Sequence, residues 1–187
     1  MNQSLHPLLA SRWSPSRFDP AHKLGEREIE TLLEAARWAP SAGNSQPWAF
    51  IVASRGTAEH TRLARHLAGS SATWAPSASL LVANLSHRLV EDTDWEFSEF
   101  SVYDLGQAVA HMSIQAQALG LHVRQFRAFD RDGIAREFAV PEHWEVTTLA
   151  AIGRAAPGAG RASALDDTGE APVRARRALD QILWPLA

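Results

Sequence analysis

The chain reads Ala39-Pro40-Ser41-Ala42-Gly43-Asn44-Ser45-Gln46-Pro47-Trp48-Ala49-Phe50 at the point where a helical segment meets an apolar strand. Apolar residues recur at helical spacing over 26–38, which predicts an amphipathic helix that ends before Pro40. The apolar run 48–53 has the length of a strand and predicts one that is buried on both faces. Pro40 and Gly43 alone would be ordinary turn residues. The full string of small side chains, amides and prolines is typical of a functional loop on a rigid scaffold.

Helical spacing of apolar residues and short apolar runs of strand length also predict the other helices and strands. Helices are predicted over 3–12, 57–68, 101–119 and 131–138, and strands over 79–84, 122–126 and 146–152. By itself, this alternation of helices and buried strands favours a doubly wound parallel sheet. The helix over 101–119 is the longest and is rich in Gly and Ala, which suits either core packing or a dimer seam. Residues 155–172 have the composition of a loop or a crossing arm.

Length and composition indicate one soluble domain of ordinary size. The 187 residues are 45% hydrophobic and 21% charged, which is close to globular averages and enough to build a core. We expect a cytoplasmic protein that does not bind membranes, because no apolar run could span a bilayer and no signal peptide is evident. A net charge of -3 argues against nucleic acid as a partner. The absence of cysteine excludes disulfides, thiolate nucleophiles and thiolate metal sites.

The side chains themselves offer no obvious acid, base or metal ligand. The eight histidines show no metalloprotease spacing, and the acidic run 87–98 is interpreted as an exposed loop in which Trp95 or Phe97 forms a mobile wall over a site. The arginines within 12–17 and 174–177 suit either a solvated face or an anionic ligand. The chain has a polar loop and separated arginine clusters but no evident catalytic side chain. This combination favours a bound cofactor that carries the chemistry.

Two blocks of this sequence resemble the nitroreductase family of FMN-dependent oxidoreductases. They are Arg12-Trp13-Ser14-Pro15-Ser16-Arg17-Phe18-Asp19-Pro20 and the segment 33–48, which contains the loop quoted above. Less specific blocks follow in the family's order at 104–108, 118–121, 151–153 and 174–179, so the resemblance covers nearly the whole chain. It implies an α+β fold with a mixed β-sheet flanked by helices. It also implies a single FMN-binding domain over 1–187 that forms an intertwined homodimer, with 155–187 as a loop and C-terminal arm.

The resemblance further implies FMN sites at the dimer interface, each built from both subunits. The implied cofactor-binding residues are Arg12, Trp13, Ser14, Ser16, Gln125, Phe126, Arg174, Arg176 and Arg177, together with Pro40, Ser41, Ala42, Asn44 and Gln46 of the second subunit. Arginine is suited to this role because its forked donors match a phosphate dianion. Gly43, Trp95 and Phe97 are expected in the substrate pocket. No metal is expected.

The activity implied by the resemblance is oxidoreduction in alternating half-reactions. NAD(P)H passes hydride to flavin N5 and leaves, and an electron-poor small molecule such as a nitroaromatic or a quinone takes its place. No side chain is assigned a catalytic role, because N5 carries the chemistry. Two alternatives stay open. One is a flavin-binding dimer without appreciable turnover, acting as a carrier or regulator. The other is a different flavin reaction on the same scaffold, such as flavin fragmentation, dehalogenation or dehydrogenation of a peptide.

Two departures from the family pattern concern the charge around the flavin. Many family members have Lys or Arg two residues after the first-block serine, near the pyrimidine edge of the ring, whereas this chain has Ser16 there. Arg17 is one place later, and neighbouring residues of an extended segment point to opposite sides. If Arg17 does not swing in to replace it, the reduced flavin lacks a nearby positive charge, and its reduction potential is expected to be lower. Arg127-Ala128 replaces small glycines and is expected to narrow or charge the pocket mouth.

Overall fold

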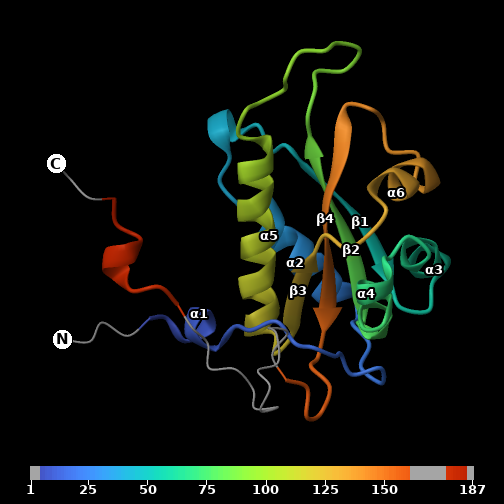
Figure 1. The fold of residues 1–187 in the computed structure, drawn as a ribbon, viewed down its shortest axis with the longest axis vertical. Coiled ribbons are helices and arrows are strands. Elements are labelled where there is room, and N and C mark those ends of the chain that lie inside the picture. The colour runs from blue at the N-terminus through green and yellow to red at the C-terminus, as the bar shows by residue number, and fades with distance from the viewer. Residues whose placement is uncertain (1–4, 161–175, 185–187) are drawn as a thin grey trace.

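The computed structural model describes residues 5–160 and 176–184, and its centre is a four-stranded sheet in the order β1-β2-β4-β3 (Figure 1). The strands are β1 (Trp48–Ser54), β2 (Leu80–His87), β3 (His122–Phe126) and β4 (Trp144–Gly153). Helices pack on both faces of the sheet, which confirms the α+β class.

All the strand pairs in the described part of the chain are antiparallel. The parallel sheet that the alternating pattern favoured is therefore wrong, and the described residues contain no parallel pair that would make the sheet mixed. The reason is the position of β4. The long helix between β2 and β3 does return the chain so that both strands run in the same direction, but β4 lies between them and pairs antiparallel with each.

The helices lie close to the predicted ranges. They are α1 (Pro7–Ser11), α2 (Glu26–Arg37), α3 (Ala58–Ala64), α4 (Gly69–Ala72), α5 (Ser101–Ala118) and α6 (Arg131–Glu137), with short 3-10 turns at Ala42–Asn44, Ala75–Ser77 and Leu179–Gln181. The main difference is in the predicted helix 57–68, of which α3 forms only Ala58–Ala64, while α4 begins at Gly69. No helix in the described part of the chain has the length and hydrophobicity that a membrane crossing requires.

The two faces of β2 belong to two separate cores. Leu80 and Val82 pack with α2 and α5, whereas Leu81, Ala83 and Leu85 pack toward α3 and α6. This alternation follows from the two-residue repeat of a strand, and it explains why the predicted strand over 79–84 is buried throughout.

By contrast, β1 lies at an edge of the sheet and is mostly half-buried, so the prediction that it is buried on both faces is wrong for this protomer. Only β2 pairs with it in the described chain. A hollow of about 270 Å³ opens beside β1 and is lined by Leu33, Arg37, Trp48, Phe50 and Val52.

A buried histidine in α3 makes the fold sensitive to acid. Only 6% of His60 is exposed, and its Nε2 atom has no hydrogen-bond partner among the described residues. Burial and the nearby charge of Arg55 lower its pKa from the ordinary value of 6.5. The folded chain therefore keeps His60 neutral at a pH at which the unfolded chain takes up a proton. Acidification below pH 6.5 thus favours the unfolded chain.

We predict that His60→Leu makes the protein less sensitive to acid. Between about pH 7.5 and 5 the melting temperature of the parent falls, and in the variant this fall is smaller because one proton-uptake site of the unfolded chain has been removed. Thermal melts across this range measure the difference. Substitution of the exposed His111 by Gln serves as the control. Equal slopes for His60→Leu and the parent would contradict this account of His60.

Candidate functional site

The first block (residues 12–20) crosses one end of the sheet, where β3 and the segment after β4 hold it in place. Ser14 Oγ donates a hydrogen bond to the Val123 carbonyl at 3.3 Å, and Arg12 Nη1 lies 3.5 Å from the same hydroxyl. The Ser16 amide donates to the carbonyl of Gly160 at 2.8 Å. The Trp13 ring makes an edge contact with the His122 ring, with 4.8 Å between centroids. All four predicted residues of the block therefore meet at this end of the sheet.

A cavity of about 610 Å³ opens beside the first block. Its lining comes from α1, the first block, α5 and β3, and consists of Leu5, Leu9, Arg12, Ser14, Ala110, Ser113, Ile114, Val123 and Gln125. The volume lies in the range of ordinary small-molecule sites. A guanidinium, hydroxyls and an amide around apolar and small side chains can bind a ligand that has both an anionic group and a flat apolar part.

Phe126 does not share this cavity with Gln125. Neighbouring residues of a strand face opposite sides of the sheet, and Phe126 packs against Trp74 with its ring centroid 4.9 Å away. Of the two residues predicted in β3, the structure therefore brings only Gln125 to the cavity.

The second block of predicted residues, 40–46, forms a tight turn before β1. Gly43, Asn44 and Gln46 have φ angles of 59°, 58° and 48°, in the left-handed region that favours glycine and asparagine. The Gln46 amide donates to Ser41 Oγ at 3.0 Å, and its side-chain Nε2 lies 3.3 Å from Asn44 Oδ1. Most of the turn is exposed, so its amides can meet a ligand or a partner.

Asp104 fixes this turn to α5, a role that the sequence reasoning missed. Its carboxylate is only 2% exposed, and its Oδ2 atom accepts a hydrogen bond from the Ala42 amide at 3.0 Å. The residue lies in the first turn of α5, where the helix dipole favours a negative charge. The block 104–108 was noted only as part of the resemblance. The available signal was a single carboxylate, in the first turn of a helix that has no other Asp, Glu, Lys or Arg.

The loop after β2 lies at the same end of the sheet as the turn, because the His87 amide donates to the Pro47 carbonyl at 3.0 Å. The His87 ring is stacked between Phe97 and Trp144, at centroid distances of 3.8 and 4.5 Å. Burial, followed by the charge of nearby His143, lowers the pKa of His87. Phe97 is therefore an anchor of the loop, whereas Trp95 is 76% exposed.

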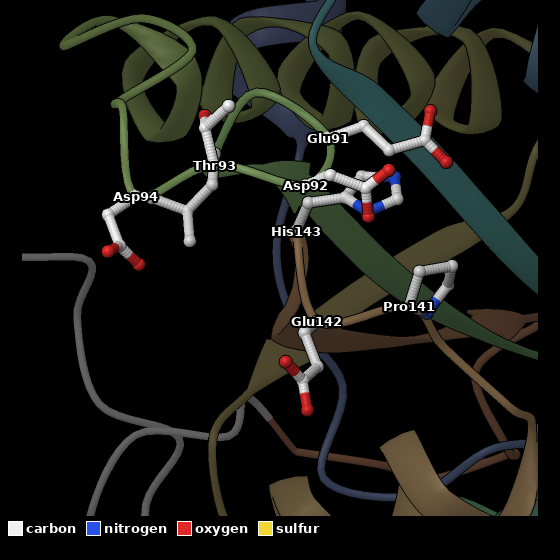
Figure 2. A pocket seen from close by; sticks show the side chains of 8 residues that line it. Glu91, Asp92, Thr93, Asp94, Pro141, Glu142 and His143 are labelled. Atoms are coloured by element: carbon white, nitrogen blue, oxygen red, sulfur yellow. The ribbon is translucent and has the colours of Figure 1, made fainter.

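A second hollow, of about 460 Å³, lies beside this loop and is strongly acidic (Figure 2). The carboxylates of Glu91, Asp92, Asp94 and Glu142 line it together with Leu89, Thr93, Pro141 and His143. Four carboxylates repel a phosphate, so this hollow is a poor site for an anionic cofactor. Within residues 5–160 and 176–184, no cluster of metal-ligating side chains is placed to hold an ion.

The predicted cofactor residues thus form two sets at different ends of one protomer. The turn contacts the first turn of α5 through Asp104, whereas the first-block cavity is lined by residues from the second half of α5. Figure 1 shows the loop after β2 at one end of the upright α5 and the first block at the other. A helix of 18 residues is about 27 Å long. Arg176 and Arg177 are exposed on the C-terminal segment, and Arg174 lies outside the described residues.

Sequence comparison connects the first part of the chain to a known family. Residues 9–83 match the model of the Nitroreductase family. The chain is 42% identical over 50 residues to the Major NAD(P)H-flavin oxidoreductase of Aliivibrio fischeri, covering 25% of this chain and 23% of that protein. It is 41% identical over 59 residues to the Oxygen-insensitive NAD(P)H nitroreductase of Salmonella typhimurium, covering 32% of this chain and 27% of that protein. The matched segments therefore span about a quarter of these relatives' length.

Structural comparison extends the likeness to most of the chain. A crystal structure described as an oxidoreductase containing FMN matches with a TM-score of 0.77 and 29% identity, over 84% of this chain and 80% of that one. The nitroreductase family protein of Streptococcus pneumoniae TIGR4 matches with a TM-score of 0.76 and 17% identity, over 96% and 98%. The nitroreductase fold and the resemblance drawn from the sequence blocks are confirmed.

We predict that Asp104→Ala loosens the turn and lowers the free energy of unfolding by about 1–3 kcal/mol, because the Ala42 amide loses a charged acceptor. Asp104→Asn keeps an oxygen acceptor and should lose less than half as much. Urea titrations measure the stability, and hydrogen exchange at 40–46 measures the local effect. If Asn is as harmful as Ala, or if exchange at the turn does not change, Asp104 does not position the turn.

Proposed function

We infer that this chain, whose residues 9–83 match the Nitroreductase family and whose described part has the nitroreductase fold, is an FMN-dependent NAD(P)H oxidoreductase. The observation that carries the proposal is the first-block cavity, in which Arg12, Ser14 and Gln125 meet beside a wall of small and apolar side chains. The names of the A. fischeri and S. typhimurium relatives, an NAD(P)H-flavin oxidoreductase and an NAD(P)H nitroreductase, support NAD(P)H as the reductant.

The donors at this cavity fit FMN. Arg12 and Ser14 can hold a phosphate and hydroxyl groups, and Gln125 can donate to and accept from a polar ring edge. Ala110, Ser113 and Ile114 of α5 leave room for a flat ring. Arg174, Arg176 and Arg177 are proposed as further phosphate ligands from the C-terminal segment. When bound, FMN supplies the two-electron chemistry that joins a nicotinamide to an acceptor. The protein's part is to bind, orient and exclude water.

We propose that the complete site needs two copies of the chain. Within one protomer the turn 40–46 contacts the first turn of α5, whereas the first-block cavity lies along the second half of that helix. In this proposal a second protomer supplies Pro40, Ser41, Ala42, Asn44 and Gln46 to the same flavin. Large apolar side chains exposed on one protomer support such an association, among them Trp38, Val102, Tyr103, Leu183 and Trp184. In this arrangement 1–187 acts as one domain, and 155–187 is the arm that reaches the partner.

The acceptor in this proposal is a small electron-poor molecule, such as a nitroaromatic or a quinone, that replaces the nicotinamide after it leaves. Gly43 and the exposed Trp95 are proposed as walls of that shared position, with Phe97 holding the loop of Trp95 in place through its stack on His87. We place the reaction in the cytoplasm, where nicotinamide nucleotides are available.

We predict that purified protein is yellow, that added FMN raises its melting temperature, and that anaerobic NADH or NADPH bleaches the flavin rapidly. Bound oxidised flavin would colour the protein yellow, and a ligand that binds only the folded protein raises its melting temperature. Absorbance, thermal melts and stopped-flow spectroscopy measure the three quantities. A colourless protein whose melting curve FMN does not move would refute the proposal. Tight binding of FMN with slow bleaching at every nicotinamide concentration would instead favour a flavin carrier or regulator.

We predict that Asn44→Gly weakens FMN binding without unfolding the protein or separating the protomers. Glycine accepts the left-handed backbone at this position, so the variant removes the amide and adds no strain. Loss of one hydrogen bond to FMN should raise its dissociation constant about tenfold. Fluorescence titration with FMN gives the affinity, and gel filtration and circular dichroism give the assembly and fold. Asn44→Leu tests strain separately, because leucine is disfavoured at positive φ. Unchanged affinity in Asn44→Gly would remove Asn44 from the site.

A further inference from the structure

His87 is the last residue of β2, and its ring holds the loop that follows against β4. The ring is stacked on Phe97 with 3.8 Å between centroids and on Trp144 with 4.5 Å, at interplanar angles of 22° and 9°. Phe97 comes from the end of the loop and Trp144 from the start of β4. The His87 amide also donates to the Pro47 carbonyl at 3.0 Å. These three rings, called the aromatic stack below, therefore join the loop to β4 and to the entry of β1.

The aromatic stack lies at the base of the loop, and the position of the tip depends on that base. The Arg88 and Leu89 amides donate to the His143 carbonyl at 2.8 and 3.2 Å, close to the stack. Farther along, the Val90 amide donates to the Trp95 carbonyl at 2.8 Å, which closes the loop on itself. The tip is exposed. A change at the base therefore moves Trp95 with the loop as a whole.

The stack accommodates a neutral imidazole better than a protonated one. The Nε2 atom of His87 is buried and has no hydrogen-bond partner among the described residues. A proton on this atom would create a charged donor without an acceptor, which is costly in a desolvated position. The faces of Phe97 and Trp144 attract a cation, but such an attraction offsets only part of that cost.

The charged groups around His87 act in opposite directions. His143, which precedes β4, has its ring centroid 5.4 Å away and disfavours a second positive charge, whereas Glu91 in the loop favours one. Arg88 and Glu145 balance each other in an ion pair at 2.6 Å, and the turn before β1 has no ionisable side chain. Burial is the largest effect, and together with His143 it lowers the pKa of His87 from 6.5. A ring that has left the stack therefore binds a proton more readily, so acid favours release.

We propose that His87 is a positioning residue whose neutral ring keeps the loop and Trp95 in place beside the shared nicotinamide and acceptor position, and that proton uptake by this ring releases the loop. The acidic hollow beside the loop favours the protonated, released ring, because the carboxylates of Glu91 and Glu142 line it (Figure 2). The role of Trp95 at the acceptor position rests on the proposed function. The release of the loop does not.

Hydrogen exchange of the purified protein with FMN added tests the release. We expect the amides of Arg88, Leu89, Val90 and Phe97, corrected for intrinsic rates, to exchange about tenfold faster at pH 5 than at pH 7.5. One proton on a group of ordinary pKa 6.5 sets an upper limit of about thirtyfold at pH 5. Amides of β4 report global unfolding and should respond less. An equal response in β4 and in the loop would overturn the proposal.

Three variants assign the response to the ring. His87→Phe keeps a flat ring in the stack and takes up no proton, so its loop should exchange at one corrected rate throughout. Phe97→Leu removes one face of the stack and should exchange rapidly already at pH 7.5. His143→Gln is the matched control and should keep most of the response, because burial of His87 is the larger effect.

Four results would overturn the proposal. They are an acid response that persists in His87→Phe, one that disappears in His143→Gln, unchanged loop exchange in Phe97→Leu, and slower loop exchange of the parent at pH 5. The last would mean that the aromatic faces hold the imidazolium more tightly than the neutral ring. If His87→Phe does not fold, the parent and Phe97→Leu decide the question.

Turnover with 1,4-benzoquinone gives the second measurement. Between pH 7.5 and 5.5 the KM of the parent should rise by about twofold or more, because apparent affinity falls with the fraction of molecules whose loop is in place. The KM of His87→Phe should rise less, and kcat should change alike in both proteins. An equal rise in KM would overturn the positioning role. Failure of the parent to bind FMN would instead refute the proposed function, while hydrogen exchange would still decide whether His87 controls the loop.

Discussion

The pairing of β4 with both β2 and β3 is the constraint on which the rest of the structure depends. Because β4 runs antiparallel to both neighbours, β2 ends and β4 begins at one end of the sheet, while β3 begins and β4 ends at the other. The turn before β1, the loop after β2 and the start of α5 therefore gather at the first end. The first block is held at the second end by Val123 and by Gly160. The division of the candidate site into two sets follows from this topology.

Much of this fold could be predicted from local periodicity, but its topology could not. The apolar run 48–53 and the repeat over 101–119 gave strand and helix positions within a few residues. Periodicity does not say which strands are neighbours, so a crossover helix between two buried strands was interpreted as a parallel pair. The insertion of β4 depends on contacts between residues far apart in sequence, such as Val123 with Ile152. The partial exposure of β1 could not be predicted for the same reason. Whether a strand lies at the edge of a sheet depends on which other strands pair with it, and its own residues do not specify this.

The sequence also could not predict those features of the candidate site that depend on contacts between residues far apart in the chain. The resemblance brought Arg12, Ser14 and Gln125 to attention, and the structure places these three around one cavity. Asp104 was missed as a residue that positions the site because it acts through a partner distant in sequence, the Ala42 amide. Phe126 was expected beside the flavin and packs on Trp74 instead. In a strand, the side that a residue faces depends on register, and register is set by pairing.

The separation of the two sets also links binding to association in the proposed enzyme. A ligand that contacts the first-block cavity of one protomer and the turn 40–46 of another binds only the assembled pair, so by mass action it stabilises that pair. The turn can serve this purpose because Asp104 fixes it to α5, the helix whose second half lines the cavity. A rigid helix therefore sets the distance between the two half-sites, and small residues along it allow close approach. In the proposed enzyme the turn 40–46 is one half of the site, and the buried carboxylate of Asp104 fixes its position on α5.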